Sequence, residues 1–414
     1  MKMIQQPETL SPTSEKQRYI ILDTLRGFAL LGICLANLPE FSLWTFLSPE
    51  AQDAMHSAHA DHITRFLQFF LFDSKFYGIF SILFGIGFSI ILSHAQEKGR
   101  SGIALFYRRL IILFFIAMAH LLLIWSGDIL CLYAITGMLL PLMSKWSDRK
   151  LLITASICLF LPVLLNLWQE TAQFRFSQPL EEAWWRKANS YGICEENFAT
   201  WLRDAESYKE VHQFLMQGAI ERMWEFVEGH RMPKVLGLFI IGFVIGRNRP
   251  YAKLPDIKPQ IIKTCWISFL IGLPTSLLYA FSAVHNQPWG LTGHSLLHLF
   301  SSLAFAFFYM TGLCLLFLKR PENRFFKWFS KPGRMALTNY IGQSLFGIII
   351  YYGIAFGLGL SMGLWQVELT AIAIFILQIM LSAWWLRFFR FGPIEWVWRM
   401  LTYGKWLSLK KQKE

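Results

Sequence analysis

Three polar side chains lie inside a stretch of this sequence that is otherwise apolar. Asp23, Arg26 and Asn37 all belong to the segment LDTLRGFALLGICLANLPE. On a helix they fall within roughly 60° of one another, and Asn37 lies roughly 16 Å beyond Arg26. Asp23 and Arg26, at positions i and i+3, are close enough to pair. Two interpretations stay open: the stripe lines a polar cavity, or the ion pair only anchors the end of a membrane helix.

A second polar group lies in RRLIILFFIAMAHLLLIWSGDILCLYAITG, residues 108–137. His120 follows Arg109 by eleven residues, which places its imidazole about 16 Å into a bilayer. At that depth an imidazole either bonds to a neighbouring helix or transfers protons. Asp128 either caps the next helix or orients His120 as a general base. We therefore take His120, Asp128 and Asp23 as candidate catalytic residues.

Two further segments contain polar groups that suit ligand binding. Lys75 follows Asp73 in FDSKFYGIFSILFGIGF, where its ammonium group snorkels outward, pairs with Asp73 or meets an anionic ligand. Asn339 and Gln343 lie at i and i+4 in GRMALTNYIGQSLFG. Their amides must point inward because lipid offers no hydrogen bonds, and they contact either a neighbouring helix or a ligand. With Asn37, these residues form our candidate substrate-binding set.

Metal and nucleotide chemistry lack support in the sequence. His56, His59 and His62 recur in DAMHSAHADHITR, but they spiral over about 120° of a helix, and zinc needs three or four converging ligands. We expect an exposed loop or surface helix there, and no metal. Cys194 alone lies in a polar region, so a disulfide framework is not expected. No Walker loop, GxSxG or HExxH motif occurs.

Membrane helices are the elements that must position these groups. Hydrophobic residues make up 54% of the 414 residues and charged residues only 16%, against about 25% in soluble domains. About ten segments are long or apolar enough to be read as spans. They cover residues 19–37, 72–95, 109–126, 128–144, 150–168, 234–248, 261–283, 295–318, 336–358 and 363–389. The sequence thus predicts an all-α polytopic bundle whose even count puts both termini on one side.

The distribution of basic residues predicts which side that is. Lys and Arg are dense in the N-terminal tail, EKGRSGIALFYRR, KWSDRK, GRNRPYAKLPDIK, KRPENRFFKWFSKPGR and the C-terminal KWLSLKKQKE. The connections expected on the other side, SGD, HNQPWGLTGH and LGLSMG, contain none. Because cytoplasmic loops are enriched in Lys and Arg, both termini are predicted to be cytoplasmic. The net charge of +12 then indicates contact with membrane lipids, and no nucleic-acid binding is expected.

The chain is predicted to have five parts. A cytoplasmic tail, 1–18, precedes an N-terminal membrane half, 19–168; a periplasmic segment, 169–233, precedes a C-terminal membrane half, 234–389, and a cytoplasmic interfacial tail, 390–414. Within the periplasmic part, SYKEVHQFLMQGAIERMWEFVEGHR has the spacing of an amphipathic helix. That helix either lies on the membrane surface or covers an outward-facing site.

Several of these stretches together resemble the YeiB-like bacterial inner-membrane proteins, whose C-terminal half is a domain of unknown function. They are YIILDTLRGFALLGICLAN, KFYGIFSILFGIGF, AHLLLIWSGDILCLYAITG, MALTNYIGQS and GPIEWVWRMLTYGKW, and they extend over residues 18–407. The resemblance implies a multi-pass protein of the bacterial inner membrane. It also implies a distant relation to transmembrane acyltransferases, which include the heparan-glucosaminide N-acetyltransferases and the acyltransferase-3 enzymes.

These acyltransferases share an LDxxRG-like helix opening, which Leu22, Asp23, Arg26 and Gly27 match here. The acetyltransferases also carry an Asn near the end of that helix, as Asn37 does here, and then a catalytic His in the next loop. This sequence departs at that point. The first His after Asn37 is His56, nineteen residues on, so the catalytic His is not carried over.

The expected function is acyl transfer from a cytoplasmic acyl-CoA to an acceptor at or across the membrane. Arg26 suits a CoA phosphate, because a guanidinium matches phosphate geometry. His120, with Asp128 or Asp23, is the expected general base, and Asn37, Lys75, Asn339 and Gln343 hold polar groups of the ligands. The alternatives are a transporter for a small metabolite or lipid, and a non-enzymatic membrane scaffold. Glycine-rich helix faces also permit a homodimer.

Overall fold

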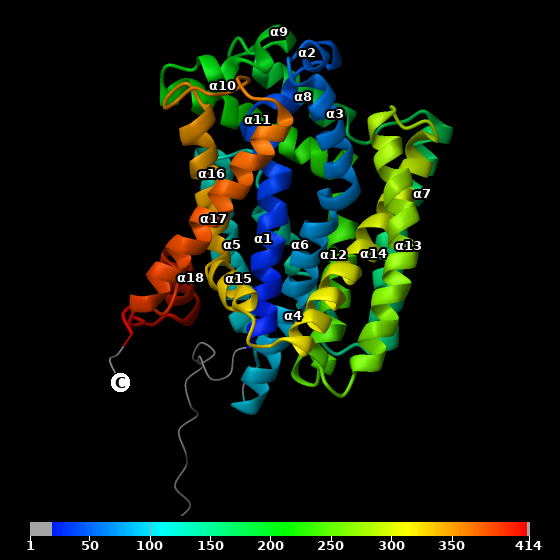
Figure 1. Cartoon of the computed structure of the whole chain (residues 1–414), viewed down its shortest axis with the longest axis vertical. Coiled ribbons are helices and arrows are strands. Elements are labelled where there is room, and N and C mark those ends of the chain that lie inside the picture. The colour runs from blue at the N-terminus through cyan, green and yellow to red at the C-terminus, as the bar shows by residue number, and fades with distance from the viewer. Residues whose placement is uncertain (1–18, 100, 412–414) are drawn as a thin grey trace, which may run out of the picture.

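The computed structural model describes residues 19–99 and 101–411, so the predicted N-terminal tail lies outside the described residues. Over the described part the chain is a bundle of helices that run mostly between two ends of the molecule (Figure 1). Seven described helices are long and apolar enough to cross a membrane. They are α1 (Ile20–Phe41), α3 and α4 (Ala58–Leu67 and Lys75–Glu97, joined by a π-helical turn), α5 (Ile103–Leu123), α7 (Asp148–Ala172), α13 (Lys258–Val284), α14 (Gly290–Lys319) and α17 (Leu364–Phe388).

A broken helix is a candidate for an eighth span. The pair α11 (Tyr208–Glu228) and α12 (Arg231–Asn248) passes the same test together, although the two axes differ by 67°. His230, at the break, has a left-handed backbone with φ of 45°. Two shorter apolar helices complete the bundle, namely α6 (Leu130–Gly137), which continues into a short 3₁₀ turn, and α16 (Ala336–Tyr351).

The predicted all-α polytopic fold is therefore confirmed, and each of the predicted segments overlaps a helix, although α16 ends at Tyr351, seven residues before the end of the predicted span 336–358. The count of about ten spans stays a prediction, because α6, α12 and α16 are each shorter than the roughly 20 residues that a straight span needs.

The polar helices gather at the two ends of the bundle (Figure 1). The short helices α2 (Pro49–Asp53), α8 (Gln178–Asn189), α9 (Glu195–Phe198) and α10 (Trp201–Asp204) lie at one end, called here the α9 end. The beginning of α1, with α15 (Arg324–Arg334) and α18 (Pro393–Tyr403), lies at the other, the α18 end. The first and last described parts thus share one end, as the charge pattern predicts; which side of the membrane that end faces stays a prediction.

Two helix crossings in the core depend on glycine. A Cβ on Gly27 of α1 would lie 1.9 Å from the carbonyl oxygen of Phe329 in α15, and one on Gly333 would lie 1.8 Å from that of Asp23. In the same way, a Cβ on Gly85 of α4 would lie 2.0 Å from the carbonyl oxygen of Phe239 in α12. Such contact requires bare backbone, which is how small residues allow membrane helices to pack closely. The Gly of the LDxxRG motif, Gly27, therefore allows the close packing of α1 against α15.

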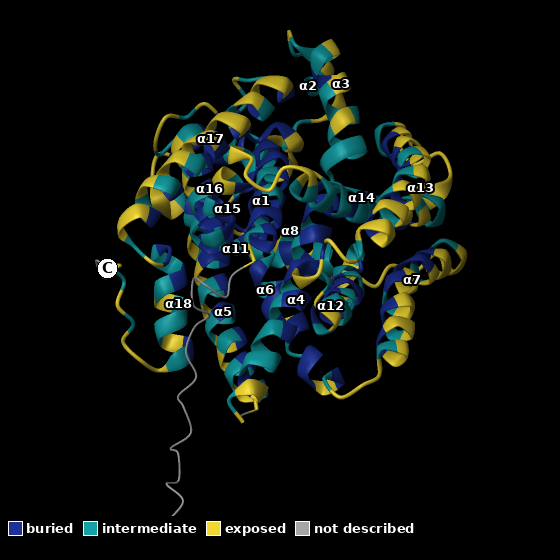
Figure 2. Cartoon of the chain, turned by 60° about the horizontal axis from the view of Figure 1, so that its bottom comes forward, coloured by how far each residue is buried: buried dark blue, intermediate teal, exposed yellow. Residues whose placement is uncertain are grey.

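Burial separates the central helices from the peripheral ones (Figure 2). In α1, 61% of the most apolar window is buried inside the protein, against 28% in α7. The outer faces of α7, α13 and α17 carry exposed Leu, Ile, Phe and Trp side chains, as expected for helices that face lipid. Thus α1 forms the centre of the bundle, and its polar stripe cannot face lipid.

Candidate functional site

A cavity of about 900 Å³ extends through the bundle alongside α1, and we call it the chamber. Both Tyr19, just before α1, and Glu40, near its end, line the chamber. At 1.5 Å per residue these two positions are about 30 Å apart, which equals the thickness of a bilayer's hydrocarbon core. The chamber therefore reaches along the full length of the central helix.

Five arginines line the chamber at its α18 end, and we call them the arginine mouth: Arg26, Arg109, Arg249, Arg334 and Arg399. Arg26 donates to the Asp23 carboxylate at 2.7 Å but keeps 27% of its side chain exposed. The Arg109 guanidinium lies 3.8 Å from the ring centroid of Trp398. Among the described residues, three carboxylates line this end, those of Asp23, Glu97 and Glu395. The mouth therefore has an excess of positive charge, which suits an anionic ligand.

The side chain of Glu395 in α18 accepts hydrogen bonds from the start of α16. Its Oε1 accepts from the backbone N–H of Leu337 at 2.6 Å and of Thr338 at 3.0 Å, and its Oε2 accepts from the Thr338 hydroxyl at 2.5 Å. This carboxylate caps the N-terminus of α16. Burial raises the pKa of the Glu395 carboxyl, although the hydrogen bonds from Thr338 and Leu337 act in the opposite direction.

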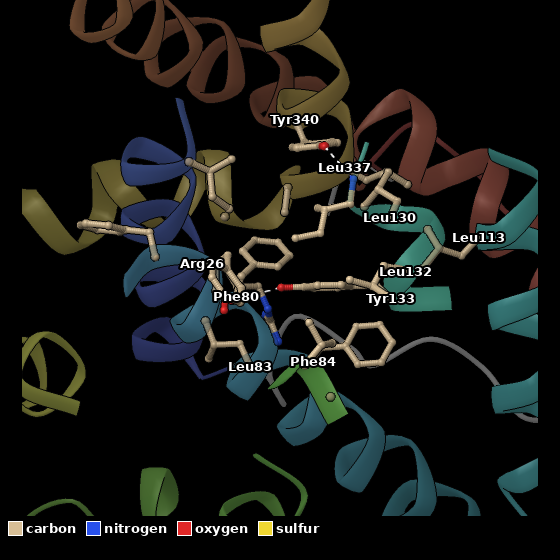
Figure 3. A pocket seen from close by; sticks show the side chains of 18 of the residues that line it. Arg26, Phe80, Leu83, Phe84, Leu113, Leu130, Leu132, Tyr133, Leu337 and Tyr340 are labelled. Carbon is tan, nitrogen blue, oxygen red and sulfur yellow. Dashed lines mark hydrogen bonds between the residues drawn. The ribbon is translucent and has the colours of Figure 1, made fainter. Parts of the chain in front are cut away.

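Beyond the mouth the chamber wall is mostly apolar and aromatic. Figure 3 shows Arg26 beside Phe80, with side chains from α4 to α6 around it: Leu83, Phe84, Leu113, Leu130, Leu132 and Tyr133. The Tyr133 hydroxyl lies 2.6 Å from Ser81 Oγ and donates to the Tyr77 carbonyl at 3.1 Å. Because its polar atoms are paired, this stretch of wall presents a surface that suits an aliphatic or pantetheine-like chain.

A second polar group lines the chamber in its α9 half, and we call it the inner cluster: Arg231, Lys234, Tyr279 and His298. Lys234 lies fourteen residues before the end of α12, about 21 Å from the α18 end. The Tyr279 ring lies 5.4 Å from that of His298, and its hydroxyl donates to Asp73 at 2.5 Å. Arg231 and Lys234 are close enough to His298 for their charges to act on its ring.

Two members of the inner cluster have polar side-chain atoms without a hydrogen-bond partner among the described residues. Among the described residues, neither Lys234 nor His298 has a hydrogen-bond or ion-pair partner, and both lie in the chamber wall. Arg231 is only loosely paired, at 4.0 Å from Glu225. Arg231 and Lys234 also belong to the first turn of α12, where positive side chains oppose the helix dipole. Two acids lie beside the inner cluster: Asp73 accepts from Tyr279, and Glu225 is shared by Arg222 and Arg231, so Lys234 forms no ion pair of its own among the described residues.

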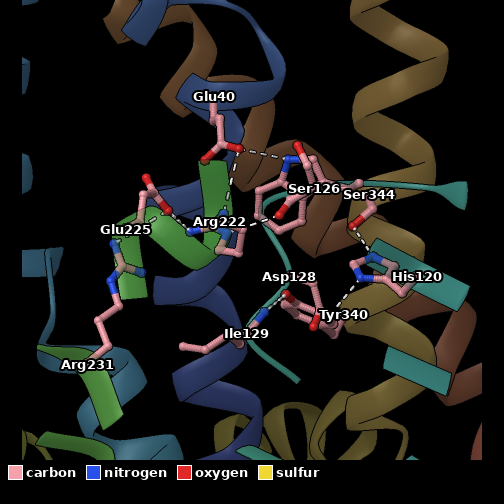
Figure 4. Close-up of polar contacts among 11 residues, drawn as sticks. Glu40, His120, Ser126, Asp128, Ile129, Arg222, Glu225, Arg231, Tyr340 and Ser344 are labelled. Atoms are coloured by element: carbon pink, nitrogen blue, oxygen red, sulfur yellow. Dashed lines mark hydrogen bonds and ion pairs between the residues drawn. The ribbon is translucent and has the colours of Figure 1, made fainter. Parts of the chain in front are cut away.

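An ion-pair network lines the chamber at the α9 end (Figure 4). Arg222 of α11 pairs with Glu225, lies 3.8 Å from Glu40 and donates to the Ser126 carbonyl at 3.0 Å. The Trp125 indole donates to Glu40 at 3.0 Å. The amphipathic helix α11 thereby contributes Arg222 and Glu225 to the chamber wall. Whether it covers an outward-facing site or lies on the membrane surface stays a prediction.

The polar stripe of α1 faces the chamber. Asp23, Arg26 and Asn37 all belong to its lining, as the stripe interpretation predicts. Asn37 lies one turn from Glu40, so it belongs to the α9 half of the chamber.

His120 and Asp128 meet, but outside the chamber lining. His120 Nδ1 lies 2.8 Å from Asp128 Oδ2, and His120 Nε2 lies 2.9 Å from the Ser344 hydroxyl of α16 (Figure 4). Asp128 Oδ1 also accepts from the Cys131 backbone at 2.8 Å, so it caps α6. The side chains of His120 and Asp128 are fully buried. This group, which we call the histidine lock, joins α5, α6 and α16.

The remaining predicted ligand residues bond to the protein itself. The Lys75 ammonium donates to the Phe69 carbonyl at 2.5 Å and lies 5.0 Å from the Tyr279 ring centroid. The Asn339 amide donates to the Met335 carbonyl and to Ser382 of α17, each at 3.0 Å. Gln343 donates to Gln378 at 3.1 Å, and Gln378 donates to the Asn339 carbonyl at 2.8 Å. These amides connect α16 to α17 and lie outside the chamber lining, as does Lys75.

The histidines of DAMHSAHADHITR lie on the surface. His56, His59 and His62 are all exposed, and His62 lies 2.8 Å from Asp53. Their positions, in a turn and on α3, agree with the expected exposed loop or surface helix.

Sequence reasoning missed the inner cluster. His298 occurs in the predicted span 295–318, and a lone imidazole in an apolar segment is the same signal that singled out His120. Lys234 was the first residue of the predicted span 234–248, where a basic residue is ordinarily interfacial. Lys234 lies in the first turn of α12, directly after the break between α11 and α12, and apolar periodicity does not reveal that break.

The helices and the chamber together define the class of protein: a multi-pass membrane protein whose spans enclose a charged chamber. Comparison with known proteins shows which family it resembles. A family described as "Protein of unknown function (DUF418)" matches residues 245–405. Over 98% of this chain and 99% of the relative, the sequence is 29% identical to "Uncharacterized protein YxaH" of Bacillus subtilis. It is 28% identical to "Uncharacterized protein YeiB" of Escherichia coli, over 93% of this chain and 96% of the relative.

The chain is similar over nearly its whole length to these YeiB-like membrane proteins. The predicted resemblance to this family is thereby confirmed. The distant relation to acyltransferases and the inner-membrane location stay predictions.

Proposed function

We propose that this protein is a transmembrane acyltransferase of the bacterial inner membrane, which transfers an acyl group from cytoplasmic acyl-CoA to a hydroxyl-bearing acceptor. One observation carries the proposal: a single chamber joins the arginine mouth to a histidine whose ring nitrogens have no partner among the described residues. A donor binding at one end and a proton acceptor deeper inside are the two parts that such a reaction needs.

The donor binds at the arginine mouth. Guanidinium groups bind phosphates bidentately, so Arg26, Arg109 and Arg399 suit the phosphates of CoA. The apolar wall between the mouth and the inner cluster then accommodates the pantetheine arm and the acyl chain. Asp23 holds Arg26 in position through the 2.7 Å ion pair.

The chemical step takes place at the inner cluster. The acceptor oxygen attacks the thioester carbonyl carbon, a C–O bond forms, and the C–S bond breaks. The acceptor's proton passes to a ring nitrogen of His298 and from there to the CoA sulfur, so that the products are an acyl ester and CoA thiol. Lys234 and Arg231 stabilise the negative charge that develops on the carbonyl oxygen, which is commonly a large contribution to catalysis.

We assign proton transfer to His298 in place of His120. Both ring nitrogens of His120 are engaged, by Asp128 and by Ser344, and its side chain is fully buried. A general base must reach the proton that it accepts. His120 and Asp128 instead hold α5, α6 and α16 together, and these helices carry part of the chamber wall.

Purified protein in nanodiscs tests this proposal. We expect wild-type protein to bind acyl-CoA saturably and the Arg26→Ala variant to lose binding by at least tenfold, because the mouth loses the guanidinium that Asp23 holds in position. Arg324→Ala is the matched control, since Arg324 is exposed on α15 and outside the lining, and it should bind as wild type does. Absent binding, or equal binding by Arg26→Ala, would remove the donor site.

A second assay tests the chemistry. Free CoA thiol should appear when membranes supply an acceptor, and His298→Gln should bind acyl-CoA normally while releasing no thiol. Unchanged thiol release by His298→Gln would refute the assigned base. If His120→Gln keeps its stability but releases no thiol, His120 would be the general base instead of His298.

A transporter is the second candidate function. The chamber reaches both ends of α1, and a broken helix lines it, as broken helices do in many transporters. Proteoliposomes separate the two candidates. A transporter moves a solute across the bilayer without releasing thiol from acyl-CoA, whereas the acyltransferase releases thiol only when the acceptor is present.

A further inference from the structure

The inner cluster opens toward the side of the bundle as well as along it. A small cavity of about 20 Å³, the side pocket, shares Tyr77, Lys234 and His298 with the chamber. A larger crevice of about 140 Å³, the lateral crevice, shares Leu159, Leu299 and Leu303 with the side pocket. The three hollows therefore form a series that leads from the chamber toward the outer surface.

The lateral crevice is an apolar space between peripheral helices. It lies between α7, which is at the periphery of the bundle (Figure 2), and the helices α12 and α14. Leu, Ile, Phe and Ala make up nearly all of its lining. Phe160 and Phe300, 6.1 Å apart between ring centroids, line it and are 45% and 38% exposed on the surface that faces lipid. Its occupant must therefore be apolar and able to come from the bilayer.

The side pocket, in contrast, contains a buried polar atom with no partner. Ser295 is 5% exposed, lines the side pocket, and its hydroxyl has no hydrogen bond among the described residues. A buried hydroxyl without a partner costs free energy, which a polar ligand group beside Lys234 and His298 would offset.

The two ends of this series differ in depth. Lys234 lies about 21 Å from the α18 end of α12, whereas Ile241, in the lateral crevice, lies about 10 Å from it. A molecule with its charged group at the inner cluster and its chain in the crevice thus points its chain toward the bilayer centre. This is the orientation of a lipid in the leaflet at the α9 end.

We propose that the inner cluster and the lateral crevice bind the phosphate head and the chain of an anionic lipid, which reaches the chamber sideways from the leaflet at the α9 end. Lys234, Arg231 and the first turn of α12 bind the phosphate, and Ser295 donates to it. The inference deepens the proposed function, on which it rests for one point only: the lipid head carries the acceptor hydroxyl that lies beside His298.

Soluble probes separate a lipid from a free anion. Protein in phosphatidylcholine nanodiscs is heated with dodecyl phosphate, with inorganic phosphate or with lysophosphatidylcholine, and the midpoint of unfolding is followed by intrinsic fluorescence. A ligand that binds the folded state raises this midpoint saturably. We expect a saturable rise with dodecyl phosphate alone. An equal rise with inorganic phosphate would indicate a free-anion site, and an equal rise with lysophosphatidylcholine would indicate an apolar site without charge selection; either result overturns the proposal.

Paired variants test the two halves of the site. Lys234→Met should weaken dodecyl phosphate binding by at least tenfold, and its control, Lys263→Met, should not, because Lys263 is exposed on α13. Leu303→Trp fills the crevice and should weaken binding similarly, whereas Leu316→Trp, at a position on α14 that is 57% exposed, should bind normally. If a test variant binds dodecyl phosphate as tightly as its control does, the corresponding half of the site, for the phosphate or for the chain, is refuted.

Wild-type protein provides a test that needs no variant to fold. A dodecyl phosphate with a photoreactive group at its chain end should cross-link to peptides of α7 and α14, and cross-links confined to other helices would overturn the proposal. Neither assay contains acyl-CoA. If the protein binds dodecyl phosphate but releases no thiol in the acyl-CoA assay, the proposed function is contradicted and the lipid site is supported. If it releases thiol but does not bind dodecyl phosphate, the lipid site is contradicted and the proposed function is supported.

Discussion

The histidine lock and the inner cluster are both polar groups inside a membrane protein, yet they differ in how their atoms are satisfied. Every ring nitrogen and carboxylate oxygen of the lock has a partner, and its side chains are fully buried. Lys234 and His298 of the inner cluster have none among the described residues, and they line the chamber. Hydrogen-bond satisfaction, rather than polarity or depth, distinguishes a group that stabilises the fold from one that is available to a ligand.

This difference has energetic consequences. Removing one partner of a buried pair leaves an uncompensated polar group and costs about 3–5 kcal/mol. Removing the side chain of Lys234 or His298, which have no partner among the described residues, leaves no partner unsatisfied. Substitutions in the two groups should therefore separate stability from binding, and the predictions below are ordered by the expected loss of stability.

The largest loss is expected for Asp128→Ala. This change leaves His120 Nδ1 and the Cys131 N–H without their acceptor, so the free energy of unfolding should fall by about 3–5 kcal/mol. Chemical denaturation in detergent measures the change. The fraction that stays folded should still bind acyl-CoA, because Asp128 is outside the chamber lining. A stable Asp128→Ala protein that has lost thiol release would instead support a catalytic Asp128.

A smaller loss is expected for Gln378→Leu. The Gln378 side chain accepts from Gln343 and donates to the Asn339 carbonyl, so its removal leaves a buried donor unsatisfied. Such a loss costs about 1–3 kcal/mol, and denaturation monitored by fluorescence would detect it. Gln366→Leu, at the exposed start of α17, is the control and should change stability less. Equal stability of the two variants would show that these amides are not structural.

The effect of Glu395→Gln should depend on pH. Because burial raises the pKa of the Glu395 carboxyl above its ordinary 4.5, the folded protein holds this proton more tightly than the unfolded chain does. The wild-type protein should therefore lose stability as pH rises above 4.5, until the folded-state pKa is passed. The glutamine variant lacks this dependence while its carbonyl still accepts from α16. Melting points of both proteins are measured from pH 4 to 7. The melting point of the variant minus that of wild type should increase as pH rises. A difference that does not change with pH would contradict the buried-carboxyl interpretation.

The smallest loss of stability is expected for Lys234→Met. Lys234 has no partner to leave behind, so the free energy of unfolding should change by no more than about 0.5 kcal/mol. The same denaturation assay measures this change, and a loss of several kcal/mol would place Lys234 among the structural groups.

The sequence predicts some of these features because they are local. Helical periodicity alone aligns Asp23, Arg26 and Asn37, and all three line the chamber. The Asp128 cap of α6 is also a short-range feature, three residues long. The long spans follow from hydropathy, and each predicted segment overlaps a helix.

Other features depend on contacts between helices that lie far apart in the chain. Ser344 satisfies His120 from 224 residues away, and no local pattern specifies that contact. The same holds for Gln343 and Gln378. Whether a buried polar residue is satisfied is thus a tertiary property that polarity alone does not predict: Gln343 donates to Gln378, while its Oε1 has no partner among the described residues. Polarity in the sequence also did not single out His298. The 67° break before α12, whose first turn contains Lys234, is tertiary as well.

One paired measurement tests the central distinction most directly: the change in melting point that saturating acyl-CoA causes in wild type, Arg26→Ala and Ser344→Ala. Ser344→Ala, which removes the partner of His120 Nε2, should melt lower than wild type but show the same rise with acyl-CoA. Arg26→Ala, which removes the 2.7 Å partner of Asp23, should also melt lower than wild type, but it should show no rise with acyl-CoA. A normal rise in Arg26→Ala, or a lost rise in Ser344→Ala, would contradict the division between the ligand-binding chamber and the structural lock.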